Sequence, residues 1–280
     1  GQSAVFYEGD DVVGGGIIHS SLQMSNHWKL QTQMKTQLYF YLIFISLLSL
    51  SACQTESIPA DDLDLGRAYY PVETGKYIEY AYDSLVYDDG GSSKYSSSGF
   101  IKEQIDSLLE ETAFEKEYRL IKFWRKQNTD PWVLTDVETI HQSKTEIIRS
   151  EENLPIIRLV FPNSQNTRWN GNALFDENII VKVSGEPIKM YQGWEYKVVK
   201  KNYTATIGQF ELDSLLEVEE VFDDSSIFSL RSVNQVYARG IGPVYREMKI
   251  YDSQRPIAGK PWEDYAEKGF YLKQTMVAHN

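Results

Sequence analysis

The most reactive side chain in the sequence is Cys53, the only cysteine among the 280 residues. A thiol can act as a nucleophile, a metal ligand or the attachment point of a lipid, and its neighbours decide between these roles. The residues before it are Lys35, an apolar run over Leu38–Leu50, and the small residues Ser51 and Ala52. A basic residue, a short apolar stretch and small residues before a cut site are the layout of a secretory signal peptide.

Leu50, Ser51, Ala52 and Cys53 resemble the lipobox of bacterial lipoproteins. The resemblance implies that the thiol takes a diacylglyceryl group and acyl chains such as palmitate, and that the chain is cut between Ala52 and Cys53. The protein is then held to a lipid bilayer through the acylated Cys53. A lipidated cysteine forms no disulfide, metal site or thiolate nucleophile. Gln54 resembles the outer-membrane sorting pattern of such lipoproteins, so we expect the cell envelope, at the outer membrane.

Two alternatives exist for the apolar run, an uncleaved anchor and a buried core helix. A spanning helix needs ~20 apolar residues, more than the run contains. Leu38–Ile45 is apolar on all sides and lacks the spacing of an amphipathic surface helix. The lipoprotein interpretation fits best and divides the chain into four parts. They are an upstream segment (residues 1–33), a signal peptide (34–52), a lipidated cysteine with an acidic tether (53–65) and a β-rich domain (66–280).

Residues 1–18 resemble the C-terminal end of the bacterial tRNA 2-thiouridylase family, in which a Val-Phe-Tyr strand, an acidic turn and a Gly-Gly-Gly-Ile strand close the last domain. The residues themselves predict a hairpin, with a strand over Ala4–Tyr7, a turn over Glu8–Asp11 and a strand from Val12. The family's activity needs a Ser-Gly-Gly-x-Asp-Ser loop and catalytic cysteines, and the sequence has neither. We expect residues 1–33 to be absent from the mature protein. A fragment of a tRNA U34 thiolation enzyme is the alternative that the first 18 residues support.

The charge of the remaining chain argues against nucleic acid as a partner. The sequence has 28 basic and 40 acidic residues, of which residues 1–53 hold two and three. Cys53–Asn280 therefore carries 26 basic and 37 acidic residues, a net charge of −11. Sequence-independent binding to nucleic acid rests on a basic surface, which this composition lacks.

Alternation of side chains predicts antiparallel strands from Val72 onward. After Gly75, the residues Ile78, Tyr80, Tyr82, Ser84 and Val86 fall on one face of a strand. A glycine- and serine-rich loop is predicted over Asp88–Gly99, then a strand over Phe100–Glu110 with Ile101, Ile105 and Leu109 on one face. The further predicted strands are Lys116–Arg125, Trp132–Ile140, Thr145–Ser150, Ile156–Phe161, Ile179–Val183, Trp194–Val199, Phe210–Val221, Ile227–Tyr237, Pro243–Tyr251 and Gly269–Val277.

The fold class follows from these runs and from the turns between them. Arg239–Gly242 predicts a tight turn whose glycines accept positive φ, and Pro261–Lys268 predicts one short helix. We predict a mainly β fold, an antiparallel sandwich or curled half-barrel sheet of about ten to twelve strands.

A second resemblance covers most of residues 66–277. The segments Gly75–Tyr77, Asp130–Trp132, Trp169–Asn172, Tyr237–Tyr245 and Lys268–Phe270 resemble recurring features of a family of uncharacterised Gram-negative lipoproteins. The resemblance implies a lipoprotein with a β fold and supplies no catalytic residues.

Catalytic, cofactor and metal motifs were not found. His141 lies near a strand end without a nucleophile motif, and His279 lies next to the C-terminus. The acidic pairs Asp88–Asp89 and Asp223–Asp224 lack the spacing of a calcium loop. Carboxylates are numerous, so a glycosidase with two carboxylates stays open. We predict no catalytic residues, no metal and no cofactor.

Aromatic residues are the remaining candidates for binding. Trp169, Asn170, Asn172 and Trp194 predict a ligand groove. The first three combine an indole ring with adaptable amides on an expected loop, and Trp194 adds a second aromatic ring. Filling of the core by these rings is the alternative. We predict an envelope lipoprotein without enzyme activity, acting as a binding or structural module for a glycan, lipid or protein ligand. An extracytoplasmic hydrolase acting on glycans is the alternative.

Overall fold

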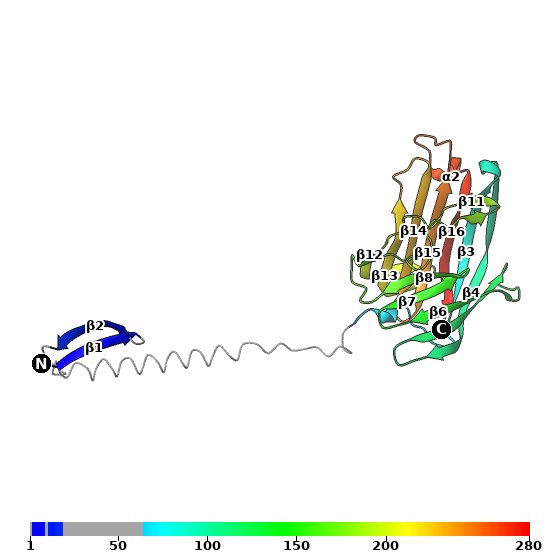
Figure 1. The fold of residues 1–280 in the computed structure, drawn as a ribbon. Coiled ribbons are helices and arrows are strands. Elements are labelled where there is room, and N and C mark those ends of the chain that lie inside the picture. The colour runs from blue at the N-terminus through cyan, green and yellow to red at the C-terminus, as the bar shows by residue number, and fades with distance from the viewer. Residues whose placement is uncertain (1, 9–10, 19–63) are drawn as a thin grey trace. The chain divides into compact units, whose positions relative to one another are not determined.

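The computed structural model describes residues 2–8, 11–18 and 64–280 (Figure 1). The chain divides into two compact units, Gly1–Leu63 and Asp64–Asn280. Ala52, Cys53, the predicted signal peptide and most of the predicted tether lie outside the described residues. No helix among the described residues is long and apolar enough to cross a bilayer.

The described part of the first unit is a hairpin of strands β1 (Gln2–Glu8) and β2 (Asp11–Ile18). The strands pair antiparallel from Gln2 opposite Ile18 to Glu8 opposite Asp11. The hairpin predicted from the sequence is confirmed, with each strand extended beyond its expected bounds. The resemblance of this segment to the tRNA-modifying family stays a prediction.

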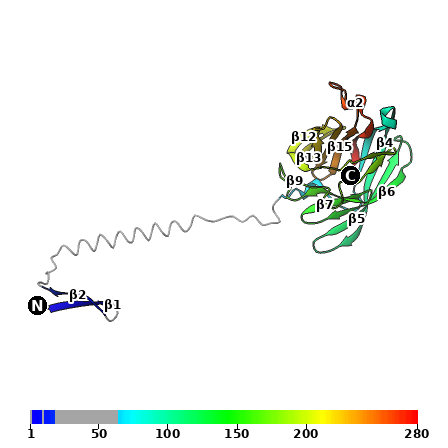
Figure 2. The same cartoon turned by 45° about the horizontal axis from the view of Figure 1, so that its top comes forward.

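The second unit is built on one antiparallel sheet of twelve strands, together with a small separate hairpin. The mainly β class, the strand number and the curled half-barrel alternative are confirmed, whereas the sandwich alternative is wrong because one sheet curls on itself (Figure 2). The strands in sheet order are β8 (Leu154–Val160), β7 (Glu146–Glu151), β6 (Val133–Gln142), β5 (Lys116–Arg125), β4 (Ser93–Glu111), β3 (Tyr77–Asp88), β16 (Lys268–His279), β15 (Gly242–Asp252), β14 (Ser229–Ala238), β13 (Phe210–Asp223), β12 (Tyr196–Ile207) and β9 (Arg168–Trp169).

Two meanders make up this sheet. Strands β3 to β8 follow one another across the first half, and β12 to β16 follow one another across the second. The halves join where β3 pairs with β16, from Gly269 opposite Tyr87 to His279 opposite Ile78. The first and last strands of the unit therefore lie in the middle of the sheet, and both free edges come from the middle of its sequence.

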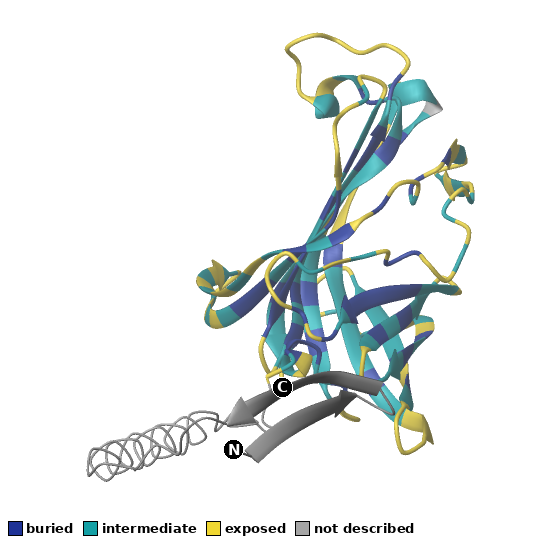
Figure 3. Cartoon of the chain, turned by 60° about the vertical axis from the view of Figure 1, so that its left-hand side comes forward, coloured by how far each residue is buried: buried dark blue, intermediate teal, exposed yellow. Residues whose placement is uncertain are grey.

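The concave face of the sheet carries the core. The alternation predicted in β3 is confirmed at its start, where Ile78 and Tyr80 are buried while Glu79 between them is less so. At its end the fully buried residue is Tyr87, on the opposite face, because it packs in a separate cluster with Tyr251 and Ala266. Dark buried residues alternate with lighter ones along the strands (Figure 3). The fully buried aromatic rings of Tyr69 and Tyr196 belong to the main apolar cluster.

One end of the concave face is closed by the segment that enters the unit, residues 65–72. It contains the short helix η3 (Arg67–Tyr69), and Tyr69, Tyr70 and Val72 are buried in the core. Its backbone is tied to the sheet, because the Gly240 amide donates to the Ala68 carbonyl at 2.7 Å. We call residues 65–72 the entry plug.

The segment between β8 and β12 crosses from one sheet edge to the other. It contains β9 and the separate hairpin of β10 (Val181–Val183) and β11 (Glu186–Ile188). At the edge, the Ile157 amide donates to the Gly171 carbonyl at 2.8 Å, and the Trp169 indole donates to the Ile157 carbonyl at 2.9 Å. These two bonds bring both edges of the curled sheet together, and we call this contact the edge seam.

Three local predictions need correction. Residues 93–99 lie in β4, so the turn after β3 is reduced to η4 (Asp89–Gly91) and its neighbours, because the strand opposite supplies backbone partners to this serine-rich stretch. A bulge after Ile105 turns Leu109 into solvent, where it is 50% exposed. The predicted helix shortens to α2 (Trp262–Tyr265). The turn with positive φ at Gly240 and Gly242 is confirmed.

Substitution of Gly171 tests the edge seam. A Cβ atom there would lie 2.3 Å from the Tyr196 ring, whereas ordinary contacts exceed 3.4 Å. We expect Gly171→Ala to lower the free energy of unfolding by about 1–3 kcal/mol, because overpacking forces a shift at the seam. Urea denaturation measures it. Leu174→Ala, at a 49% exposed position in the same segment, should change stability by less than about 0.5 kcal/mol. Equal effects of the two variants would contradict the assignment.

Candidate functional site

The concave face encloses a cavity of about 420 Å³ between the sheet and the β10–β11 hairpin. Its wall combines charged, polar and apolar side chains from both halves of the sheet. The lining residues are Tyr80, Ser84, Val86, Glu103, Lys122, Glu138, Arg149, Glu151, Glu152, Ile156, Arg158, Val181, Lys182, Val183, Met190, Tyr191, Gln235, Pro243, Arg246, Met248, Phe270, Leu272 and Gln274.

Arg149 organises the charged wall of the first half. Its two terminal nitrogens donate to both oxygens of Glu103 at 2.9 and 2.6 Å, a bidentate pair. Its Nε donates to Glu138 Oε2 at 2.5 Å, and Lys122 Nζ donates to the other oxygen of Glu138 at 3.0 Å. Neighbouring strands β4, β5, β6 and β7 each supply one of these residues, because each places a charged side chain at an inward position.

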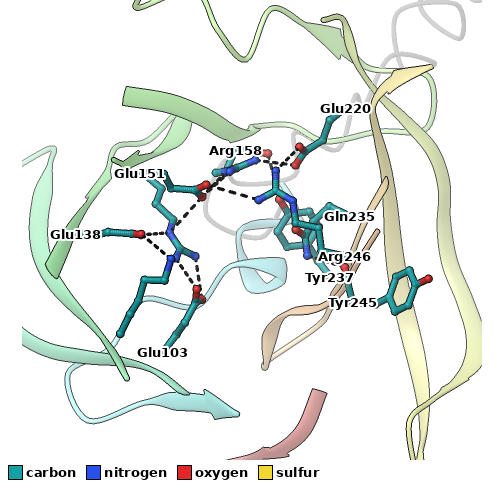
Figure 4. A network of polar contacts seen from close by, with 11 residues as sticks. Glu103, Glu138, Glu151, Arg158, Glu220, Gln235, Tyr237, Tyr245 and Arg246 are labelled. Atoms are coloured by element: carbon teal, nitrogen blue, oxygen red, sulfur yellow. Dashed lines mark hydrogen bonds and ion pairs between the residues drawn. The ribbon is translucent and has the colours of Figure 1, made fainter. Parts of the chain in front are cut away.

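Arg158 carries the network across the interior to the second half. Its Nη1 donates to Glu220 on β13 at 2.8 Å, and its Nε donates to Glu151 on β7 at 3.0 Å. Arg246 on β15 donates to the second oxygen of Glu220 at 2.7 Å. Glu220 is completely buried. Figure 4 shows these side chains converging from opposite sides of the curl.

The network is neutral as a whole. It contains four carboxylates and four cations, and each of them is ion-paired within the set. We call these eight residues the interior charge network, which consists of Glu103, Glu138, Glu151, Glu220, Lys122, Arg149, Arg158 and Arg246.

The arginines fix the protonation of the carboxylates. Burial alone would raise the pKa of Glu103, but the charge and hydrogen bonds of Arg149 outweigh it and hold that pKa below its usual range. Burial is likewise outweighed at Glu151, where Arg158, Arg149 and Arg246 hold the pKa well below the usual range. Both carboxyls are therefore ionised at neutral pH, and the pKa of Arg149 and of Arg158 is raised by the same carboxylates against burial.

The other wall of the cavity is apolar. Val86, Met248, Phe270 and Leu272 come from the central strands of the sheet, and Val181 and Val183 face them from the hairpin. The hairpin is held to the sheet by the buried side chain of Ile188 and by the Lys268–Glu186 ion pair at 3.4 Å. The cavity thus has a charged half against β4–β8 and an apolar half beneath the hairpin.

The residues predicted as a ligand groove lie behind this wall and not in it. Trp194 is buried, and its indole donates to the Met190 carbonyl at 2.5 Å. Trp169 packs on Tyr196 at 5.5 Å between ring centroids and belongs to the edge seam. The structure brings the two indoles into contact with the same Tyr196 ring.

The two amides of this set stabilise the crossing segment. Asn172 donates through Nδ2 to the Tyr191 carbonyl at 3.2 Å and is buried. Exposed Asn170 accepts from the Asn172 amide at 2.9 Å. The alternative given in the sequence analysis, that these residues fill the core, accounts for the contacts. Ligand binding by the four residues stays a prediction.

The interior charge network was missed from the sequence, although one signal was present. Glu103 lies between Ile101 and Ile105, which were expected to share a face, so the alternation already placed a carboxylate inside. Arg149 and Arg158 each follow a predicted inward residue, Ile147 and Ile156, by two positions, so the same alternation places both arginines inside. A charged residue at an inward position requires a partner, and the partners are distant in sequence.

Neither histidine of the described domain lies in the cavity wall. His141 lies on β6, half-exposed, with Nε2 3.8 Å from Glu115. His279 lies within β16, and its ring packs against Phe210 at 5.7 Å between centroids. Across residues 64–280, no three His, Cys, Asp or Glu side chains gather in a way that could hold a metal ion.

Comparison with known proteins gives structural likenesses of low identity. No protein family and no curated protein matches the sequence. The fold is similar to that of a Bacteroides fragilis protein described as exported with a YmcC-like fold, at 11% identity and a TM-score of 0.37, covering 75% of this chain and 98% of that one. A Parabacteroides distasonis protein described as a lipoprotein is similar at 12% identity and a TM-score of 0.34, covering 76% and 98%.

Removal of the Glu220 carboxylate tests the network. Glu220→Ala leaves Arg158 and Arg246 without their shared partner, and we expect a loss of about 3–5 kcal/mol in the free energy of unfolding. Glu219→Ala, at the adjacent position that is not fully buried, should cost less than about 0.5 kcal/mol. Urea denaturation of both variants measures the difference, and similar values would contradict a central role for Glu220.

The lowered carboxyl pKa values predict acid sensitivity. A pKa lower in the folded than in the unfolded state contributes stability above the ordinary value of 4.5, and this contribution is lost as the pH falls through the folded pKa. We expect the free energy of unfolding to decrease steadily below about pH 4.5. Glu103→Gln should flatten part of this slope. An unchanged slope in that variant would contradict the assignment to Glu103.

Proposed function

We propose that this protein is a lipid-anchored envelope protein whose curled sheet binds a small ligand in the interior cavity without catalysis. The observation that carries the proposal is the cavity of about 420 Å³ with one charged and one apolar half. Small-molecule sites have volumes of ~300–1,000 Å³ and combine apolar walls with a few placed polar groups. The cavity meets both conditions, whereas a module with a purely structural role would gain stability from a filled core.

The anchor rests on the residues around Cys53. A basic residue, a short apolar run and Leu50–Ala52 before the cysteine support export and acylation. Gln54 favours the outer membrane as the site of anchoring. The described domain begins at Asp64, so about ten residues of acidic tether separate it from the lipid.

The chemistry of the cavity favours binding over glycan hydrolysis. A glycosidase needs one carboxylic acid with a raised pKa to protonate the leaving group. Glu103 and Glu151 have lowered pKa values instead. Glu138 and Glu220 are each bonded to two cations. All four carboxylates of the network therefore serve as fixed acceptors for arginine and lysine.

Replacement of Cys53 tests the anchor. We expect Cys53→Ala to abolish the incorporation of radiolabelled palmitate into the expressed chain, because the acyl chains are attached through this cysteine. Ser57→Ala in the tether should leave the incorporation unchanged. Incorporation of palmitate by the Cys53→Ala variant at the level of the unchanged protein would contradict lipid attachment at Cys53.

Filling the cavity tests the ligand site. The probe is N-phenyl-1-naphthylamine, an uncharged dye that fluoresces in apolar surroundings, added to the purified chain carrying Cys53→Ala. We expect saturable binding at one site, and Ser84→Phe should weaken it by about tenfold, or about 1.4 kcal/mol, by filling the cavity. The matched control Ser96→Phe, exposed on β4 outside the cavity, should change it by less than about twofold. Equal effects would contradict the site.

A further inference from the structure

We infer that the ligand of the cavity carries no net charge and joins an apolar part to a head group rich in oxygen acceptors, such as the hydroxyls of a glycoside. The inference rests on the proposed function and specifies the ligand of the same site. Three features of the wall carry it: the balance of charge, an excess of hydrogen-bond donors, and the position of the apolar half.

Because its charges balance, the network offers no net charge to pair with a charged ligand. Its four cations are paired with its four carboxylates at 2.5–3.0 Å. The exposed rim adds Glu152 and Lys182, which again cancel. A charged ligand would lose its hydration on entry and meet no uncompensated opposite charge, so its transfer would be costly.

The donors of the network are not exhausted by these pairs. Nε of Arg246 has no hydrogen-bond partner, but it is fully buried, so the accessible spare donors belong to Lys122. Lys122 carries three N–H donors and uses one on Glu138 Oε1. The carboxylate oxygens, by contrast, accept from the arginines and the lysine. A ligand at this wall therefore completes the hydrogen bonding by offering oxygen acceptors.

The apolar half of the cavity determines the chemistry of the second part of the ligand, which must be apolar. Phe270, Leu272 and Met248 on the sheet face Val181 and Val183 on the hairpin across the cavity. An alkyl chain or a ring between them would be removed from water on both sides, and burial of apolar surface stabilises binding. Because the two halves share one cavity, the head group and the apolar part must belong to one molecule.

Three probes with the same tail and different charge test the inference. They are n-octyl β-D-glucoside, octanoate and octylammonium, each below its micelle concentration, added to the purified chain with Cys53→Ala. Displacement of N-phenyl-1-naphthylamine and isothermal titration calorimetry report binding. We expect the glucoside to bind at least about tenfold more tightly than either ion, and Ser84→Phe but not Ser96→Phe to weaken it. Equal or tighter binding of an ion would overturn the inference.

A variant that alters the net charge of the cavity wall provides a second test of the inference. Lys182→Met at the exposed rim leaves the wall with one negative charge in excess, and we expect octylammonium to gain about threefold or more in affinity. Lys126→Met, at an exposed position outside the cavity, should change none of the three affinities. No gain in the rim variant would overturn the role assigned to charge balance.

The outcomes separate the two proposals. Tight binding of an ion at the site blocked by Ser84→Phe would leave the binding function standing and remove the neutral ligand. Failure of the dye and of all three probes to bind would remove the proposed function and the inference with it.

Discussion

The buried ion pair of Arg158 and Glu220 is the constraint on which the rest of the fold depends. Arg158 lies on the edge strand β8, and Glu220 lies on β13 near the opposite edge. Separation of the two would leave Arg158 with Glu151 alone and Glu220 with Arg246 alone in the interior, which would destabilise the buried network. The sheet must therefore curl until β8 and β13 face each other, and the edge seam at Gly171 can form only in that arrangement.

The cavity follows from the same constraint. Planar guanidinium groups held between carboxylates cannot interdigitate as closely as branched aliphatic side chains do in an ordinary core. The apolar core is densely packed, with Tyr69, Tyr196 and Leu216 fully buried. At the level of the network the interior stays open, so one set of contacts both closes the sheet and leaves room inside it.

The parts of the fold that could be predicted from the sequence are those set by residues close together in the chain. Alternation in β3, the hairpin of β5 and β6, and the glycine turn before β15 depend on neighbouring residues, and each was predictable. The pairing of β3 with β16 joins residues about 190 positions apart, and nothing local encodes it. The serine-rich start of β4 lacks strand propensity and becomes a strand only because β3 lies beside it.

The candidate site, too, was only partly predictable from the sequence. Inward carboxylates and arginines could be found from their position in the alternation, but their partners could not, since Arg149 meets Glu103 across 46 residues. The tryptophans predicted to bind a ligand satisfy their N–H groups on backbone carbonyls, a contact that composition does not distinguish from a binding site.

Under the anchoring proposed above, the entry plug has a mechanical consequence. Any tension on the tether enters the domain at Asp64, which is ion-paired with Arg239. The load then passes to the bonds of Asn163 with the Leu65 and Gly66 carbonyls and of Gly240 with that of Ala68. The strands of the sheet lie behind these bonds, so a pull from the membrane strains the plug and its tyrosines before it reaches the walls of the cavity.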